Sequence, residues 1–202
     1  MHLIELTTEN VTKRSVIHLL KYMAWKPEYL KYMTEMPGRE HYRMLAEISH
    51  QLPDGSKIAD IGTYFGASAL ALSSNPNVNV TTYDIVGCIP NDAGYTALTR
   101  DNVVQKVIPG QEDMENISSS DLVVLDIDPH DGLTEVAFVK LLIEKGFKGI
   151  LVCDNIKVNE GMQEFWNSIP AHLKKIDVTH LAHWTSTGIV VFDPSYIDVE
   201  VK

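Results

Sequence analysis

Hydrophobic positions in the first quarter of the chain recur every three or four residues, the spacing that lines one face of a helix. One such stripe contains Val16, Leu19, Leu20 and Met23, and another contains Met44, Leu45 and Ile48. Pro27 and the Met-Pro-Gly sequence at 36–38 interrupt the pattern, as turn-forming residues do. The spacing predicts a helical section over residues 1–52 that ends in a helix over residues 40–51.

The pattern changes after the turn sequence at 52–55, where short apolar runs begin to alternate with amphipathic stretches. This alternation is typical of βαβ units, and continuously apolar runs are typical of strands covered on both faces. The pattern predicts strands over 57–61, 78–83, 103–108, 121–125 and 149–153, and helices over 67–73, 94–101, 134–145 and a stretch carrying Met162, Phe165, Trp166 and Ile169. Two final strands, over 175–179 and 188–192, are too close for a crossover helix, so we expect an antiparallel hairpin.

Together these elements predict an α/β fold: a Rossmann-like three-layer α/β/α sandwich with a mostly parallel seven-stranded sheet, a C-terminal antiparallel hairpin and extra N-terminal helices. A length of 202 residues suits one domain, so we expect a single domain over 1–202 with its Rossmann-like core over 56–202. No apolar run approaches the roughly 20 residues of a membrane helix, and the N-terminus does not resemble a signal peptide. We therefore expect a cytoplasmic protein with no membrane partner.

The net charge of the chain and the distribution of its basic residues indicate which kinds of molecule it can bind. The formal net charge is −10, and the chain has no cluster of Lys and Arg that could neutralise phosphates. This excludes a typical nucleic-acid-binding surface and favours a small-molecule substrate. Cys88 and Cys153 lack metal-site spacing, so we expect both to be reduced thiols, with Cys153 in the core. The sequence does not decide between a monomer and a homodimer.

A glycine-bearing motif lies where the first core strand ends and a helix begins, the position at which open α/β sheets bind ligands. It reads Asp60-Ile61-Gly62-Thr63-Tyr64-Phe65-Gly66-Ala67-Ser68. Gly62 and Gly66 allow a tight turn and a close approach of the backbone to a ligand. A second acid, Asp84, follows the next strand about 20 residues later, where it can accept hydrogen bonds from ribose hydroxyls.

The motif lacks the three glycines of G-x-G-x-x-G, which seat a pyrophosphate, and this weighs against NAD and FAD. Acid-x-Gly-x-x-x-Gly resembles instead the class I S-adenosylmethionine-dependent methyltransferases, whose cofactor carries an amino acid and a ribose but no phosphate. The resemblance implies cofactor contacts from Asp60, Gly62, Tyr64, Gly66, Ser68 and Asp84. In this family the loop after the third strand reaches the adenine, which adds Glu112 and Asp113, although the same pair could instead cap a solvated helix.

Polar side chains also follow the fourth and fifth core strands. Asp126 comes directly after one strand, and Asp154 and Asn155 come directly after the other. Because these strands are neighbours in such a sheet, we expect the three side chains to converge beside the cofactor pocket, where Asp126 could also contact the cofactor. Two carboxylates and an amide oxygen suit a hard ion such as Mg²⁺.

In these features the chain resembles the metal-dependent O-methyltransferases, the family of catechol and caffeoyl-CoA methyltransferases, from residue 36 to residue 155. The resemblance rests on the glycine motif, on Leu125-Asp126 and on Cys153-Asp154-Asn155. It implies that Asp126, Asp154 and Asn155 bind the metal, and that residues 36–39 form a loop over the methionine end of the cofactor.

The family often has a lysine shortly after the first metal ligand, which takes the proton of the substrate hydroxyl. This chain has Pro129 and His130 there instead. Histidine commonly transfers protons at neutral pH, so His130 is one candidate base and Asp128 is another. Alternatively, the metal alone acidifies the hydroxyl.

The sequence therefore predicts O-methylation of a small-molecule hydroxyl with S-adenosylmethionine and a divalent metal. A metal-independent methyltransferase of small-molecule or glycan tailoring would share the cofactor site and differ in the metal site. A nicotinamide oxidoreductase would need the pyrophosphate loop that the motif lacks. A protein that binds the cofactor without turnover is a further alternative, because binding residues do not prove catalysis.

Overall fold

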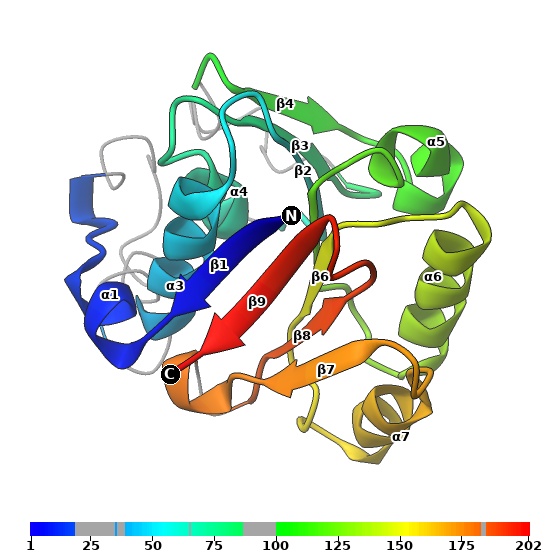
Figure 1. The fold of residues 1–202 in the computed structure, drawn as a ribbon. Helices are drawn as coiled ribbons and strands as arrows, with labels where there is room; N and C mark the ends of the chain where they lie inside the picture. Colours follow the sequence, from blue (N-terminus) through cyan, green and yellow to red (C-terminus); the bar gives the residue numbers. More distant parts are fainter. Residues whose placement is uncertain (19–34, 36–38, 65, 87–99, 183–184) are drawn as a thin grey trace.

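The computed structural model describes residues 1–18, 35, 39–64, 66–86, 100–182 and 185–202, and a seven-stranded sheet forms its centre (Figure 1). In spatial order the strands are β4 (Val103–Lys106), β3 (Asn79–Tyr83), β2 (Lys57–Ile61), β5 (Leu122–Leu125), β6 (Ile150–Cys153), β8 (Gly188–Val191) and β7 (Lys174–Asp177). Strand β8 pairs antiparallel with both β6 and β7, and the other neighbours pair in parallel. The mostly parallel sheet and its C-terminal antiparallel hairpin are therefore confirmed.

Helices cover both faces of this sheet. One face packs against α3 (Arg39–Gln51) and α4 (Ala67–Leu72), and the other packs against α5 (Met114–Ile117), α6 (Leu133–Glu144) and α7 (Glu160–Ser168) (Figure 1). Successive strand residues point to opposite faces. On β5, Leu122 and Val124 join the first core, whereas Val123 and Leu125 join the second. The three-layer α/β/α sandwich follows from this alternation.

Most predicted elements lie within one or two residues of their observed bounds. Short 3-10 turns, η2 (Gly110–Asp113) and η3 (Thr179–Leu181), follow β4 and β7. Most of the helix predicted over 94–101 lies outside the described residues, as do Leu19, Leu20 and Met23 of the predicted N-terminal stripe. Cys153 is a buried free thiol, as expected, and Cys88 lies outside the described part. None of the described helices has the length and apolar character to cross a membrane.

The prediction of a helical section over residues 1–52 is wrong at its start. Residues His2–Leu6 form strand β1, which pairs in parallel with β9 (Ile197–Val201) at the other end of the chain (Figure 1). The short helix α1 (Thr8–Lys13) follows β1, and its N-cap Thr7 accepts a hydrogen bond from the backbone of Asn10. Ile4 and Leu6 are fully buried on one side of β1, which is the two-residue period of a strand. The error arose because the pairing partner lies more than 190 residues away in sequence.

Candidate functional site

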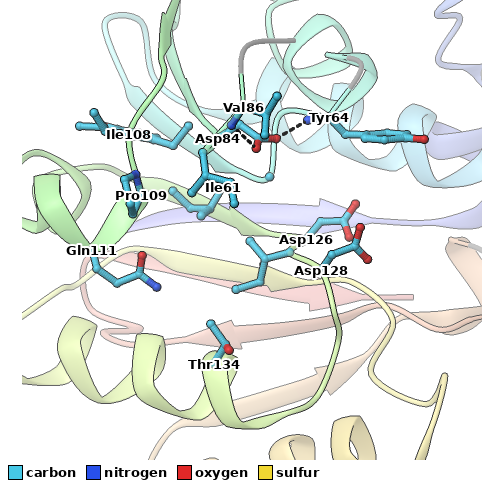
Figure 2. A pocket seen from close by; sticks show the side chains of 15 residues that line it. Ile61, Tyr64, Asp84, Val86, Ile108, Pro109, Gln111, Asp126, Asp128 and Thr134 are labelled. Atoms are coloured by element: carbon cyan, nitrogen blue, oxygen red, sulfur yellow. Dashed lines mark hydrogen bonds between the residues drawn. The ribbon is translucent and has the colours of Figure 1, made fainter.

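A pocket of about 540 Å³ opens at the carboxyl ends of β2, β3, β4 and β5 (Figure 2). Its described lining consists of Ile61, Gly62, Tyr64, Tyr83, Asp84, Ile85, Val86, Ile108, Pro109, Gly110, Gln111, Asp126, Ile127, Asp128 and Thr134. The volume lies within the usual range of small-molecule sites, roughly 300–1,000 Å³. The pocket therefore lies at the sheet edge where the sequence predicted a ligand, with Gly62 and Asp84 on the same cavity.

The loop after β2 brings backbone close to the neighbouring strand end. Gly62 has a φ of +100°, and a Cβ there would lie 1.6 Å from the carbonyl oxygen of Asp126. Its N–H donates to the carbonyl of Tyr83 at 2.9 Å. Gly66, with a φ of +78°, begins helix α4 in the left-handed conformation. Glycine is thus required at position 62 both by the backbone angle and by the space available.

Asp84 is held in the pocket wall by two backbone amides. One carboxylate oxygen accepts a hydrogen bond from the N–H of Tyr64 at 2.8 Å, and the other accepts from the N–H of Val86 at 3.1 Å (Figure 2). Each carboxylate oxygen can accept more than one hydrogen bond. Asp84 is therefore oriented in advance and can still bind hydroxyl donors from the cavity.

Asp60 lies behind the pocket wall and is wholly buried. Its Oδ2 accepts hydrogen bonds from the hydroxyls of Thr82, at 2.8 Å, and Ser68, at 3.0 Å. Its Oδ1 has no hydrogen-bond partner among the described residues. Burial raises the pKa of Asp60 to about 7. The carboxyl thus links α4 to β2 and β3 through hydrogen bonds to Oδ2, while Oδ1 has no hydrogen-bond partner among the described residues.

The turn after β4 does not bring the predicted acidic pair into the cavity. Glu112 is exposed, and neither Glu112 nor Asp113 belongs to the described lining. The Asp113 carboxylate accepts from the hydroxyl of Tyr83 at 2.8 Å and pairs with Lys106, whose ammonium lowers the pKa of that carboxyl. Gln111 is the long polar side chain of this turn that lines the pocket (Figure 2). Sequence spacing does not predict this contact, because the direction of a side chain in a turn depends on tertiary packing.

Asp126 and Asp154 occupy equivalent positions on neighbouring strands. Leu125 of β5 pairs with Cys153 of β6, so each acid directly follows its strand, and the N–H of Asp154 donates to the carbonyl of Leu125 at 3.1 Å. The pKa of Asp126 is raised, first by removal from bulk water and next by the nearby carboxylate of Asp154. The structure therefore brings these two predicted metal ligands together.

The donor set of this cluster suits a hard divalent ion. Among the residues that the structure describes, no three His, Cys, Asp or Glu side chains form a complete metal cluster by themselves. Two carboxylates with the amide of Asn155 could bind a cation if water or substrate completed the shell, and a cation would relieve the repulsion that raises the pKa of Asp126. Asp154 is 5% exposed, and its Oδ1 accepts a hydrogen bond from the Thr187 hydroxyl at 3.0 Å. The ring nitrogen Nδ1 of His41 lies 3.6 Å from the same oxygen.

The two candidate bases lie on the loop between β5 and α6. Asp128 lines the pocket beside Asp126, and its side chain is 92% exposed (Figure 2). The ring of His130 is 20% exposed, and its Nε2 lies 3.2 Å from the amide nitrogen of Asn155 and 3.6 Å from Asp128. His130 does not belong to the described pocket lining. Of the two candidate bases, Asp128 therefore belongs to the described pocket lining and His130 does not.

The sequence matches no protein-family model and no curated protein. Solved structures nevertheless share its fold. Cofactor-bound Rv0187 from MTB superposes with a TM-score of 0.53 at 16% identity, over 87% of this chain and 88% of that one. A Staphylococcus aureus protein described as a caffeoyl-CoA O-methyltransferase gives a TM-score of 0.53 at 15% identity, over 88% of this chain and 97% of that one. Spermidine synthase from Thermotoga maritima gives 0.54 at 13% identity, over 76% of this chain and 60% of its own.

At these identities the similarity establishes the fold. The chain shares with these structures an α/β fold, in which its own strand order is β4-β3-β2-β5-β6-β8-β7 and the antiparallel strand β8 lies next to the edge.

Proposed function

We propose that this protein is an S-adenosylmethionine-dependent methyltransferase that methylates a hydroxyl of a small molecule with the help of a divalent cation. The observation that carries the proposal is the pocket itself, in which Asp84 and the Gly62 loop face one cavity at the carboxyl edge of the sheet. Ligands of open α/β sheets bind at this edge. A solved structure that shares this fold is described as a caffeoyl-CoA O-methyltransferase, which supports S-adenosylmethionine as the ligand of this cavity.

The charge of the pocket favours this cofactor over a dinucleotide. Three carboxylates, those of Asp84, Asp126 and Asp128, line the cavity, and the described lining contains no Lys or Arg. A sulfonium cation gains from nearby carboxylates, whereas a pyrophosphate is repelled by them. This supports S-adenosylmethionine and weighs against NAD.

Each part of the cofactor has a candidate partner. Asp84, already oriented by two backbone amides, would accept hydrogen bonds from the ribose hydroxyls. Gln111 offers an amide donor and acceptor to the adenine, so we assign to it the contact first expected of Glu112 or Asp113. We assign the cofactor's ammonium to the unpartnered Oδ1 of Asp60, although Asp60 is buried behind the described lining, next to Ile61 and Gly62.

Methyl transfer of this kind needs positioning more than activation. The acceptor oxygen attacks the methyl carbon in line with the sulfur, the carbon–sulfur bond breaks as the carbon–oxygen bond forms, and the acceptor proton is released. A divalent cation held by Asp126, Asp154 and Asn155 would supply Lewis acidity toward the acceptor hydroxyl. We assign the proton to Asp128, because its carboxylate lines the pocket whereas His130 does not.

The direct test is a methyl-transfer assay with S-adenosylmethionine labelled in its methyl group and a panel of catechols, other small-molecule alcohols and amines. We expect label in a hydroxyl-bearing acceptor, with Mg²⁺ present. Label found only in amines would contradict O-methylation. Absence of transfer to every acceptor, with cofactor binding intact, would favour a protein that binds without turnover.

Metal dependence is tested by chelation. We expect a chelating agent to abolish transfer, Mg²⁺ to restore it, and Asp154→Ala to lose at least about 100-fold in activity together with divalent-ion binding, since a ligand of the cation is removed. Asp177→Ala, which changes an aspartate on the edge strand β7, is the control and should retain both. Unchanged turnover in the chelating agent would show that the enzyme is metal-independent.

A further inference from the structure

Glu135 is a buried acid that the proposed reaction does not use. It lies in the first turn of α6 and is 2% exposed, and neither of its carboxylate oxygens has a side-chain hydrogen-bond partner among the described residues. Burial raises the pKa of Glu135, and the backbone N–H groups of Glu135 and Gly132 offset this only in part. Leaving a buried polar group without a partner costs about 1–3 kcal/mol, and more for a charged group. Packing alone does not explain an acid at this buried position.

The side chain of His130 lies close to Glu135. The ring nitrogen Nδ1 of His130 lies 4.0 Å from Oε1 of Glu135, and it too lacks a hydrogen-bond partner among the described residues. The backbone of His130 is fixed in the left-handed region, with a φ of +55°, and its carbonyl accepts from the side-chain amide of Asn159 at 2.8 Å. Nδ1 of His130 and Oε1 of Glu135 thus lie 4.0 Å apart, and neither atom has a side-chain hydrogen-bond partner among the described residues.

The other ring nitrogen of His130 faces an amide. Its Nε2 lies 3.2 Å from Nδ2 of Asn155, whereas the nearest oxygens of Asp128 and Asp126 are 3.6 and 3.8 Å away. An amide nitrogen can only donate, so Nε2 must accept. A neutral imidazole that accepts at Nε2 carries its proton on Nδ1, the ring nitrogen that lies 4.0 Å from Oε1 of Glu135.

We propose that Glu135 and His130 are positioning residues that orient the amide of Asn155. Glu135 fixes the tautomer and the ring plane of His130, and His130 Nε2 holds the amide nitrogen of Asn155. Because nitrogen and oxygen are opposite ends of the amide, this contact turns the oxygen of Asn155 away from the ring, where it is available as a cation ligand. This proposal rests on the cation site of the proposed function.

The first test reads the tautomer of His130 in the metal-free protein. Two-bond ¹H–¹⁵N correlation spectra of protein with ¹⁵N-labelled histidine separate the two tautomers, and the His130→Asn variant assigns the signal. We expect a proton on Nδ1 in the wild type, loss of that preference in Glu135→Leu, and its retention in Glu135→Gln, whose amide oxygen still accepts. A wild-type proton on Nε2, or an unchanged tautomer in folded Glu135→Leu, would overturn the proposal.

The second test measures Mn²⁺ affinity by the paramagnetic resonance signal of the free ion. Loss of a partner that orients a metal ligand typically costs 10–100-fold in affinity, so we expect at least a tenfold loss in Glu135→Leu and a smaller loss in Glu135→Gln. Glu144→Gln, an exposed position on the same helix, is the matched control and should bind as the wild type does. Equal affinity in folded Glu135→Leu and Glu144→Gln would also overturn the proposal.

An error in the proposed cation site can be distinguished from an error in the proposed roles of Glu135 and His130. If the wild type bound no divalent ion while S-adenosylhomocysteine still bound, the cation site would be wrong. The tautomer measurement needs no metal and would still decide whether Glu135 orients the ring of His130. Because wild-type protein alone can give the contradicting tautomer, the test does not depend on the folding of Glu135→Leu.

Discussion

Gly62 and Gly146 both have positive φ angles, +100° and +69°, but their surroundings differ. A Cβ at Gly62 would collide with the carbonyl of Asp126, whereas a Cβ at Gly146 would meet nothing within 4 Å. The two positions therefore separate the cost of the backbone angle from the cost of the collision.

We expect Gly146→Ala to lower the free energy of unfolding by about 1–2 kcal/mol, the cost of the left-handed angle for a residue with a Cβ. Gly62→Ala should cost more than about 3 kcal/mol, because β2 and β5 must also move apart. Urea denaturation of both variants measures the difference. Equal losses would mean that the close approach at Gly62 is not maintained in solution.

If Asp60 binds the cofactor's ammonium as proposed, cofactor binding depends on pH. The pKa of Asp60 is raised to about 7 by burial, so the carboxyl is largely neutral below that pH, whereas an ammonium is bound by the ionised form. We expect the affinity for S-adenosylhomocysteine to rise up to about tenfold per pH unit between pH 5.5 and 7 and then to level off. The Asp60→Asn variant should bind S-adenosylhomocysteine more weakly, with an affinity that does not change with pH. Calorimetric titrations at several pH values measure this. A wild-type profile without this rise would remove Asp60 from the ammonium site.

At the scale of elements, the β1–β9 pair joins the two ends of the chain. Ile4 on β1 is fully buried in the core beside α3, whereas its neighbour Leu3 is 38% exposed. We expect Ile4→Ala to lower the free energy of unfolding by about 2–5 kcal/mol, as a buried large-to-small change does. Leu3→Ala is the matched control, and we expect it to cost less than about 1 kcal/mol in the same urea titrations. Similar losses in the two variants would contradict the burial pattern of β1.

The core strands could be predicted from the sequence because each is a short apolar run between turn signals. The residues Lys57–Ile61, for example, form β2 with the bounds that the pattern predicts. The strand β1 could not be predicted in this way, because its alternation over five residues is short and its partner lies at the opposite end of the chain. Pairing between distant segments leaves no local signal in one sequence.

At the scale of the whole molecule, the candidate site is assembled from the ends of several strands. Gly62, Asp84 and Asp126 could be predicted because each directly follows an apolar strand, and parallel strands end at one edge. Gln111 and Glu135 could not be predicted, because their importance lies in the direction of one side chain and the burial of the other. Both properties depend on packing between segments that are distant in sequence.

We propose that the cavity between the Gly62 loop and Asp84 binds the adenosyl cofactor. This proposal is tested most directly by calorimetric titration of S-adenosylhomocysteine into the wild type, Asp84→Asn and Asp101→Asn, an exposed aspartate before β4. We predict one site per chain in the wild type, the same affinity in Asp101→Asn, and at least about a tenfold loss in Asp84→Asn, because hydrogen bonds to a charged group contribute about 1.5–3 kcal/mol each. No binding to the wild type, or equal affinity in all three proteins, would contradict this account of the pocket.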